Sequence, residues 1–111
     1  MSYIKNIEHE KVMKLADQVQ VMPGQIVSKT LAQNAAVSVT LFAFAKGEEI
    51  GAHDSAGDAF VTVLEGTGRF TVGGVEHIVH AGEALVMPAN VMHSVYGEED
   101  FKWMLTVVFP A

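Results

Sequence analysis

Two stretches of sequence decide the fold of this chain. The first is GEEIGAHDSAGDAFVTVLEG, residues 47–66, and the second is GEALVMPANVMHSVYG, residues 82–97. Each begins and ends at a glycine, and each contains one histidine, His53 in the first and His93 in the second. Both alternate turn-forming residues with short runs of apolar, partly β-branched residues, a pattern typical of β strands bounded by turns. The two stretches therefore predict β structure around two histidines.

The same pattern extends in both directions from these stretches. Two β-like runs are separated by Gly73-Gly74, and a two-glycine loop favours a β-hairpin because both residues accept positive φ. The expected strands are residues 26–31, 37–44, 60–64, 69–72, 75–79, 85–87, 93–96 and 101–109. About eight strands, with turn residues about every 8–12 positions, predict an all-β sandwich or barrel.

The first part of the chain has a different rhythm. Ile4, Ile7, Leu15 and Val19 follow a loose helical spacing that stops at Pro23-Gly24. The same residues also fit a first short strand. We therefore expect an N-terminal segment, residues 1–24, that contains at most a short helix, followed by a β-barrel domain, residues 25–111.

Length and composition predict one domain, and they exclude several kinds of functional site and partner. The 111 residues are 50% hydrophobic and 18% charged, which is typical of a single globular domain. The absence of cysteine excludes disulfides, thiolate metal sites and cysteine nucleophiles. A formal charge of −6 argues against nucleic acid and anionic membranes as partners. No secretory signal and no apolar run of about 18 residues is visible, so we expect a cytoplasmic protein.

The last expected strand, residues 101–109, is apolar on both faces. Trp103 and Leu105 share one parity, and Met104 and Val108 share the other. Because a small barrel fills its core from the inward face only, the outward face needs another cover. A second copy of the chain in a homodimer is the simplest cover. The alternative is that the N-terminal segment folds over this face.

The two histidine stretches resemble the two sequence motifs of the cupin superfamily. The matching positions are Gly47, His53 and Gly66 in the first motif and Gly82, Pro88 and His93 in the second. Asn90 lies where the second motif has a glycine, a conservative exchange because asparagine tolerates the left-handed conformation. The resemblance implies a single-domain cupin jelly-roll β-barrel. The chain is also similar to small cupins with one histidine and a Gly-Asp pair in the first motif.

The chain departs from the cupin pattern at the metal ligands. Metal-binding cupins use two histidines and a glutamate from the first motif and one histidine from the second. Here Ser55 and Ala59 occupy the second histidine and the glutamate positions, so His53 and His93 alone remain. The resemblance allows a divalent metal (Zn, Fe, Mn or Ni), but two imidazoles alone bind weakly. The incomplete set favours a barrel with no tightly bound metal.

Two interpretations of His53 and His93 stay open. In one, they hold a metal whose shell is completed by water, a substrate carboxylate or His77. In the other, they are hydrogen-bonded and metal-free at the polar end of an apolar pocket. Asp58, one position from the glutamate site, points to the opposite face on a regular strand, and we interpret it as capping backbone amides.

The expected pocket residues follow from the two motifs and from the apolar residue types. They are His53, Ser55, Ala59, Phe60, His77, Met87, His93 and Met104. We favour a module that binds a small, largely apolar molecule in the barrel, with the two histidines as polar anchors. The alternatives are a divalent-metal-dependent enzyme of dioxygenase or isomerase type, and a structural or regulatory dimeric subunit.

Overall fold

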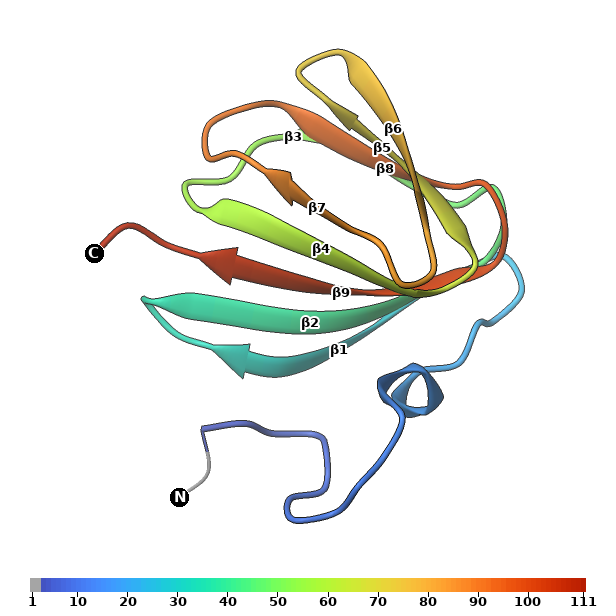
Figure 1. The fold of residues 1–111 in the computed structure, drawn as a ribbon, viewed down its shortest axis with the longest axis vertical. Helices are drawn as coiled ribbons and strands as arrows, with labels where there is room; N and C mark the ends of the chain where they lie inside the picture. The colour runs from blue at the N-terminus through green and yellow to red at the C-terminus, as the bar shows by residue number, and fades with distance from the viewer. Residues whose placement is uncertain (1–2) are drawn as a thin grey trace.

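The computed structural model describes residues 3–111, and nearly all of its regular structure is β (Figure 1). Its elements are η1 (Leu15–Gln18), β1 (Ile26–Gln33), β2 (Val37–Phe44), β3 (Glu49–His53), β4 (Asp58–Glu65), β5 (Thr67–Val72), β6 (Val75–His80), β7 (Ala84–Met87), β8 (His93–Gly97) and β9 (Phe101–Val108). Within residues 3–111, no helix has the length and apolar character needed to cross a membrane.

The strands form two antiparallel sheets that face each other. One has the order β1-β2-β9-β4-β7 and the other the order β3-β8-β5-β6. Figure 1 shows β9 between β2 and β4, so the C-terminal strand runs through the middle of the larger sheet. The all-β jelly-roll barrel expected from the sequence is confirmed.

Turn chemistry closes the β5–β6 hairpin as the sequence predicts. Val72 pairs with Val75, and both intervening glycines, Gly73 and Gly74, have positive φ (56° and 83°). The strand β3 was not expected. It is short and largely exposed, and Gly51 and Ala52 follow its one β-branched residue, Ile50, so no apolar alternation marks it.

An aromatic cluster fills the barrel around Trp103. Its indole ring stacks on Phe42 with ring centroids 4.7 Å apart, and it meets Phe70 of the opposite sheet edge-on at 5.2 Å. Phe44 completes the contact at 5.8 Å. Because successive residues of a strand point to opposite faces, Trp103 and Leu105 face this core.

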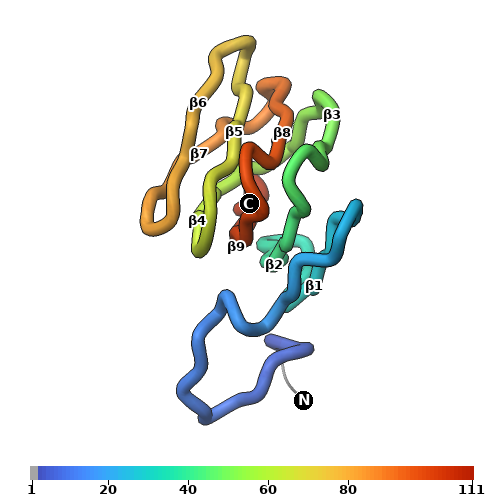
Figure 2. Tube along the Cα trace, turned by 90° about the vertical axis from the view of Figure 1, so that its right-hand side faces the viewer, coloured from blue at the N-terminus to red at the C-terminus, as the bar shows by residue number. Residues whose placement is uncertain are grey.

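The N-terminal segment covers part of the outer face of the larger sheet, on the side of β1 and β2 (Figure 2). Val19 is buried there against Leu41 and Ala43, with Leu15 and Met104 packed around them. This is the alternative to a partner subunit that the sequence left open. The first two residues of the 1–24 segment lie outside the described range.

Only one turn of the expected helix forms, the 3-10 turn Leu15–Gln18. Earlier in the segment, Asn6 and Glu10 have positive φ (64° and 58°), a conformation that no right-handed helix contains. Hydrogen bonds to β1 hold the chain in this path instead. The backbone amide of Lys5 donates to the Leu31 carbonyl (2.7 Å), and the side-chain amide of Asn6 donates to the Thr30 carbonyl (2.8 Å).

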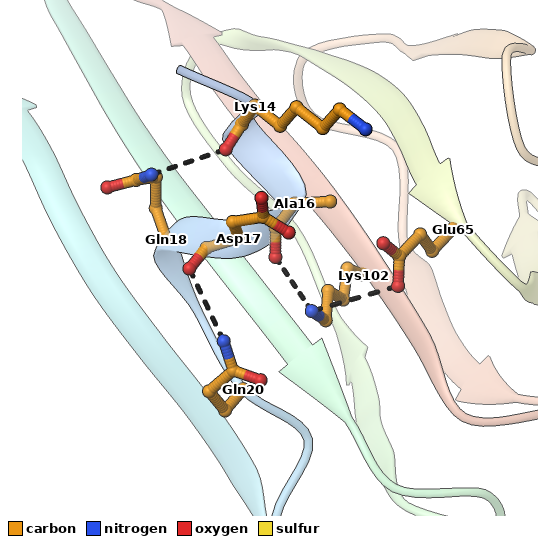
Figure 3. Close-up of polar contacts among 7 residues, drawn as sticks. All are labelled: Lys14, Ala16, Asp17, Gln18, Gln20, Glu65 and Lys102. Atoms are coloured by element: carbon orange, nitrogen blue, oxygen red, sulfur yellow. Dashed lines mark hydrogen bonds and ion pairs between the residues drawn. The ribbon is translucent and has the colours of Figure 1, made fainter.

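A buried lysine ties the 3-10 turn to the sheet (Figure 3). Lys102 points outward from β9 and is only 8% exposed. Its Nζ donates to the Ala16 carbonyl (2.7 Å) and lies 3.7 Å from the Glu65 carboxylate. Around the turn, the side-chain amide of Gln18 donates to the Lys14 carbonyl and that of Gln20 to the Asp17 carbonyl.

Another part of the outer face stays uncovered in the monomer. Phe60, Val86 and Val108 are each about half exposed on neighbouring strands β4, β7 and β9. Phe60 pairs with Val86 across β4 and β7, which places the two side chains on the same face. The homodimer stays a prediction, and these three residues are its candidate contact.

Candidate functional site

The two motif histidines lie side by side at one end of the barrel. His53 ends β3 and His93 begins β8, and the two residues are direct register partners. Their ring centroids are 4.4 Å apart with the ring planes at 70°. His53 is exposed, whereas His93 is only 4% exposed. The pair therefore reaches from solvent into the barrel.

Both histidines make the same local hydrogen bond. Nδ1 of His53 lies 2.8 Å from the Gly51 carbonyl, and Nδ1 of His93 lies 3.1 Å from the Val91 carbonyl. A carbonyl oxygen only accepts, so Nδ1 is the protonated nitrogen in each ring. In the neutral form each Nε2 then carries a free lone pair.

Burial disfavours the charged form of His93. Desolvation by burial lowers the pKa of His93 below its usual value of 6.5, and the nearby His53 lowers it further. The hydrogen bond to Val91 and the Asp54 carboxylate act in the opposite direction but do not reverse the shift.

The inner side of the pair is apolar. His93 shares its face of β8 with Val95, which is buried in the barrel core. Val72 of β5 is the register partner of His93 on the other side and packs on the same core, as does Ile50 of β3. The arrangement is a polar end on a hydrophobic interior.

The residues at the other two ligand positions do not fit the metal site of metal-binding cupins. The Ser55 hydroxyl oxygen accepts a hydrogen bond from the Gly57 amide (3.1 Å). Ala59 is buried with Met87 and Val107 as its register partners, so carbon lies where an acidic ligand would be needed. Residues 3–111 contain no group of three or more His, Asp or Glu that could hold a metal ion.

Asp58 has the structural role expected of it. It is exposed at the start of β4, and its carboxylate accepts a hydrogen bond from the Ala89 amide (2.8 Å). This contact links the two motifs, because Ala89 lies in the turn before β8. In the same turn Asn90 adopts φ 63°, the left-handed conformation predicted for this glycine position.

The other expected pocket residues separate into two groups. Ala59 and Met87 are buried in the barrel core. His77 is half-buried on β6 as the register partner of buried Phe70, and β5 separates its strand from β8. The structure thus places His77 on the expected face but on a different strand from the histidine pair.

Two of the expected pocket residues are corrected by the structure. Phe60 follows the inward residue Ala59, so strand alternation turns it to the outer face, where it is 47% exposed. Met104 follows inward Trp103 and packs against the N-terminal segment instead. Residue type suggested a pocket wall for both, and strand parity excludes them from the barrel interior.

Met104 lines a separate groove outside the barrel. This groove has a volume of about 500 Å³ and lies between the N-terminal segment and the outer face of the larger sheet. Its lining includes Ile7, Met13, Leu31 and Val39 and is mainly apolar. It holds neither motif histidine.

Sequence reasoning missed the groups that orient the histidines. These are the backbone carbonyls of Gly51 and Val91, two positions before each ring, and a backbone group leaves no mark in residue identity. It also missed that Trp103 Nε1 is buried without a hydrogen-bond partner in the described chain.

Comparisons with known proteins agree with this fold. The Cupin domain family matches residues 40–109, well over half of the chain. A conserved protein of unknown function from Streptococcus pyogenes is 43% identical over 100% of this chain and 97% of its own, with a TM-score of 0.98. A cupin superfamily protein from Desulfitobacterium hafniense DCB-2 is 27% identical over 98% of this chain and 100% of its own (TM-score 0.93).

More distant similarity reaches KdgF from Halomonas sp., 22% identical over 100% of this chain and 96% of its own, with a TM-score of 0.72. At that identity the likeness shows the fold alone. No curated protein sequence matches significantly. On the strength of the family match and the two motifs, the chain belongs to the cupin domain family.

Proposed function

We propose that this cupin domain binds a small, largely apolar molecule at the end of the barrel marked by His53 and His93. The observation that carries the proposal is a nearly buried imidazole, His93, beside a second, exposed one at the edge of an apolar interior. Ligand sites typically combine mostly apolar walls with a few placed polar groups.

The hydrogen bonding of the pair supports this proposal. The side-chain hydrogen bonds described for residues 3–111 use Nδ1 of both histidines and Nε2 of neither. Within residues 3–111 only Trp103 Nε1 is buried without a partner, so Nε2 of His93 keeps a solvent-facing edge although its ring is only 4% exposed. A bound molecule that donates a hydrogen bond to Nε2 would take the place of water at that edge.

The incomplete ligand set places binding ahead of metal-dependent catalysis. Catalytic zinc sites generally hold the metal with three protein ligands. Here the Ser55 oxygen already accepts from Gly57, and Ala59 has no donor atom at all. The proposed site therefore works through the imidazoles and the apolar wall, and we derive no reaction step.

Amide-detected NMR with cyclohexanol as the probe tests the proposal. We expect the backbone amides of His53, His93 and Val72 to shift in a saturable titration. In His93→Phe the saturable response should be weakened, whereas it should persist in the matched control His80→Phe, which changes an exposed histidine of β6. Shifts confined to the outer groove, or none, contradict the proposal.

A further inference from the structure

We propose that the His53–His93 pair selects ligands that donate hydrogen bonds, and specifically uncharged ring compounds with hydroxyl groups on two adjacent carbons, over anionic ligands. This inference rests on the proposed function and adds the polar chemistry of the ligand. It follows from the hydrogen bonds of the two rings and from the placement of the charged side chains.

The first step is the shared tautomer. Each ring donates from Nδ1 to the carbonyl two residues before it, at Gly51 for His53 and at Val91 for His93. Both neutral rings therefore offer an acceptor, Nε2, and no second donor. A carboxylate, phosphate or ether oxygen also accepts only, so it has nothing to receive from this pair.

The second step is the number of acceptors. His53 and His93 are direct cross-strand partners with ring centroids 4.4 Å apart, so the two acceptors belong to adjoining rings. Two hydroxyl groups on neighbouring carbons of one small molecule supply two donors, one for each ring. A hydrocarbon ring behind them matches the apolar side of the site, which Val72 and Ile50 provide.

The third step is charge. The lysine and arginine residues within the β strands are Lys29, Arg69 and Lys102. All three side chains lie on the outer faces of the sheets. Lys29 is the register partner of Leu41, which packs against Val19 of the N-terminal segment on the outer face, and Lys102 contacts Ala16 of the same segment. Arg69 lies over the Tyr96 ring (4.5 Å) and is paired with Glu76 and Glu98.

No lysine or arginine of the described strands thus faces the barrel interior, and the residue that follows His53 is acidic, Asp54. An anion at the pair meets a carboxylate and no compensating cation, which is unfavourable. A neutral donor avoids that repulsion. The charge pattern and the tautomers therefore favour the same class of ligand.

Three ring compounds of similar size separate the possibilities in calorimetric titrations at pH 8. The probes are cis-1,2-cyclohexanediol, its dimethyl ether and cyclohexanecarboxylate. We expect the diol to bind about tenfold or more tightly than the ether, which is the loss expected when both of its hydrogen-bond donors are removed. The carboxylate should bind at least as weakly as the ether.

Substitution of the exposed partner provides the control. In His53→Phe the preference for the diol over the ether should fall several-fold, while His80→Phe should keep it. Equal binding of diol and ether, or tighter binding of the carboxylate, overturns the donor preference but leaves the proposed function intact. Failure of all three compounds to bind overturns the proposed function together with this inference.

Imidazole ¹⁵N NMR tests the tautomers without any ligand. At pH 8 we expect Nδ1 to be protonated and Nε2 unprotonated in both His53 and His93. Protonated Nε2 in either ring contradicts the inference, whatever the titrations show.

Discussion

Ala59 lies opposite Met87 across β4 and β7, and both side chains are buried in the barrel core. Metal-binding members of the superfamily carry an acidic ligand at the position of Ala59. In this chain the neighbouring strand presents a methionine side chain to that position. At the position of Ala59, the interior of this barrel is therefore apolar, whereas a metal-binding cupin has a carboxylate there.

This relationship predicts how the protein responds to metal. Zn²⁺ added to the wild-type protein should be removed by desalting, because two imidazoles alone bind it weakly. Plasma emission spectroscopy of the desalted protein measures the retained metal. Stoichiometric zinc after desalting would contradict the account, and loss of that zinc in His80→Phe would show that it is bound elsewhere.

Ala59→Glu should destabilise the fold by at least about 2 kcal/mol, because it places a carboxylate among buried apolar groups. Added Zn²⁺ should recover part of this loss, since the substitution restores the acidic residue of the metal-binding cupin pattern. Thermal unfolding with and without Zn²⁺ measures both effects. The control Ala59→Gln, of similar size but uncharged, should show a weaker recovery.

The lowered pKa of His93 predicts a pH dependence of stability. In the unfolded chain the residue takes up its proton near pH 6.5, and in the folded protein only at a lower pH. The unfolded state therefore binds more protons in this range, so the free energy of unfolding falls as pH drops below about 6.5. Urea unfolding between pH 8 and 5 should show a flatter profile for His93→Gln than for the wild type. An unchanged slope in His93→Gln would refute the assignment, and His80→Gln serves as control.

The buried, unpartnered indole N–H of Trp103 predicts that two substitutions of this residue differ widely in their cost to stability. Trp103→Ala should cost about 3–5 kcal/mol because it empties the centre of the aromatic cluster. Trp103→Phe keeps most of the stacking with Phe42 and removes the unpaired Nε1–H, whose burial costs about 1–3 kcal/mol. We therefore expect a much smaller loss for Trp103→Phe in chemical unfolding. Similar losses for the two variants would show that the indole N–H is paired in solution.

The hydrogen bond from Lys102 to Ala16 is expected to hold the N-terminal segment against the sheet. Lys102→Met keeps the apolar stem but removes the charged hydrogen bond to Ala16, at a cost of about 1–3 kcal/mol. Hydrogen exchange should rise selectively around Leu15–Gln18 and Val19. The control Lys46→Met, at an exposed position, should leave exchange in that segment unchanged. Unchanged exchange in Lys102→Met would show that packing of Val19 alone holds the segment.

The predicted homodimer has its own test in the exposed residue Phe60. If a second copy covers Phe60, Val86 and Val108, sedimentation should show a dimer that Phe60→Glu converts to monomer. Ile78→Glu, which adds the same charge on the other sheet, should remain dimeric. A monomeric wild type at high concentration contradicts the prediction.

Much of the fold was predictable because local chemistry and tertiary structure agree. The Gly73-Gly74 hairpin and the left-handed Asn90 follow from single residues whose backbone preferences decide the turn. The strand β3 was not predictable in this way, since Gly51 and Ala52 have no β preference. Pairing with β8 forms that strand, and such pairing between distant residues leaves no local signal.

The candidate site was predictable in part. The two motifs identified His53 and His93, and the register of β3 with β8 makes them neighbours. Phe60 and Met104 were misplaced because residue type outweighed strand parity, although inward Ala59 and Trp103 precede them directly. The tautomers depend on the carbonyls of Gly51 and Val91, whose positions only the folded backbone sets.

A crystal structure of the protein with cis-1,2-cyclohexanediol tests the central claim most directly. The account predicts the diol at the end of the barrel, with its two oxygens within about 3.2 Å of Nε2 of His53 and of His93. A diol that binds only in the groove beneath the N-terminal segment, or that meets the histidines through neither Nε2 atom, would contradict it.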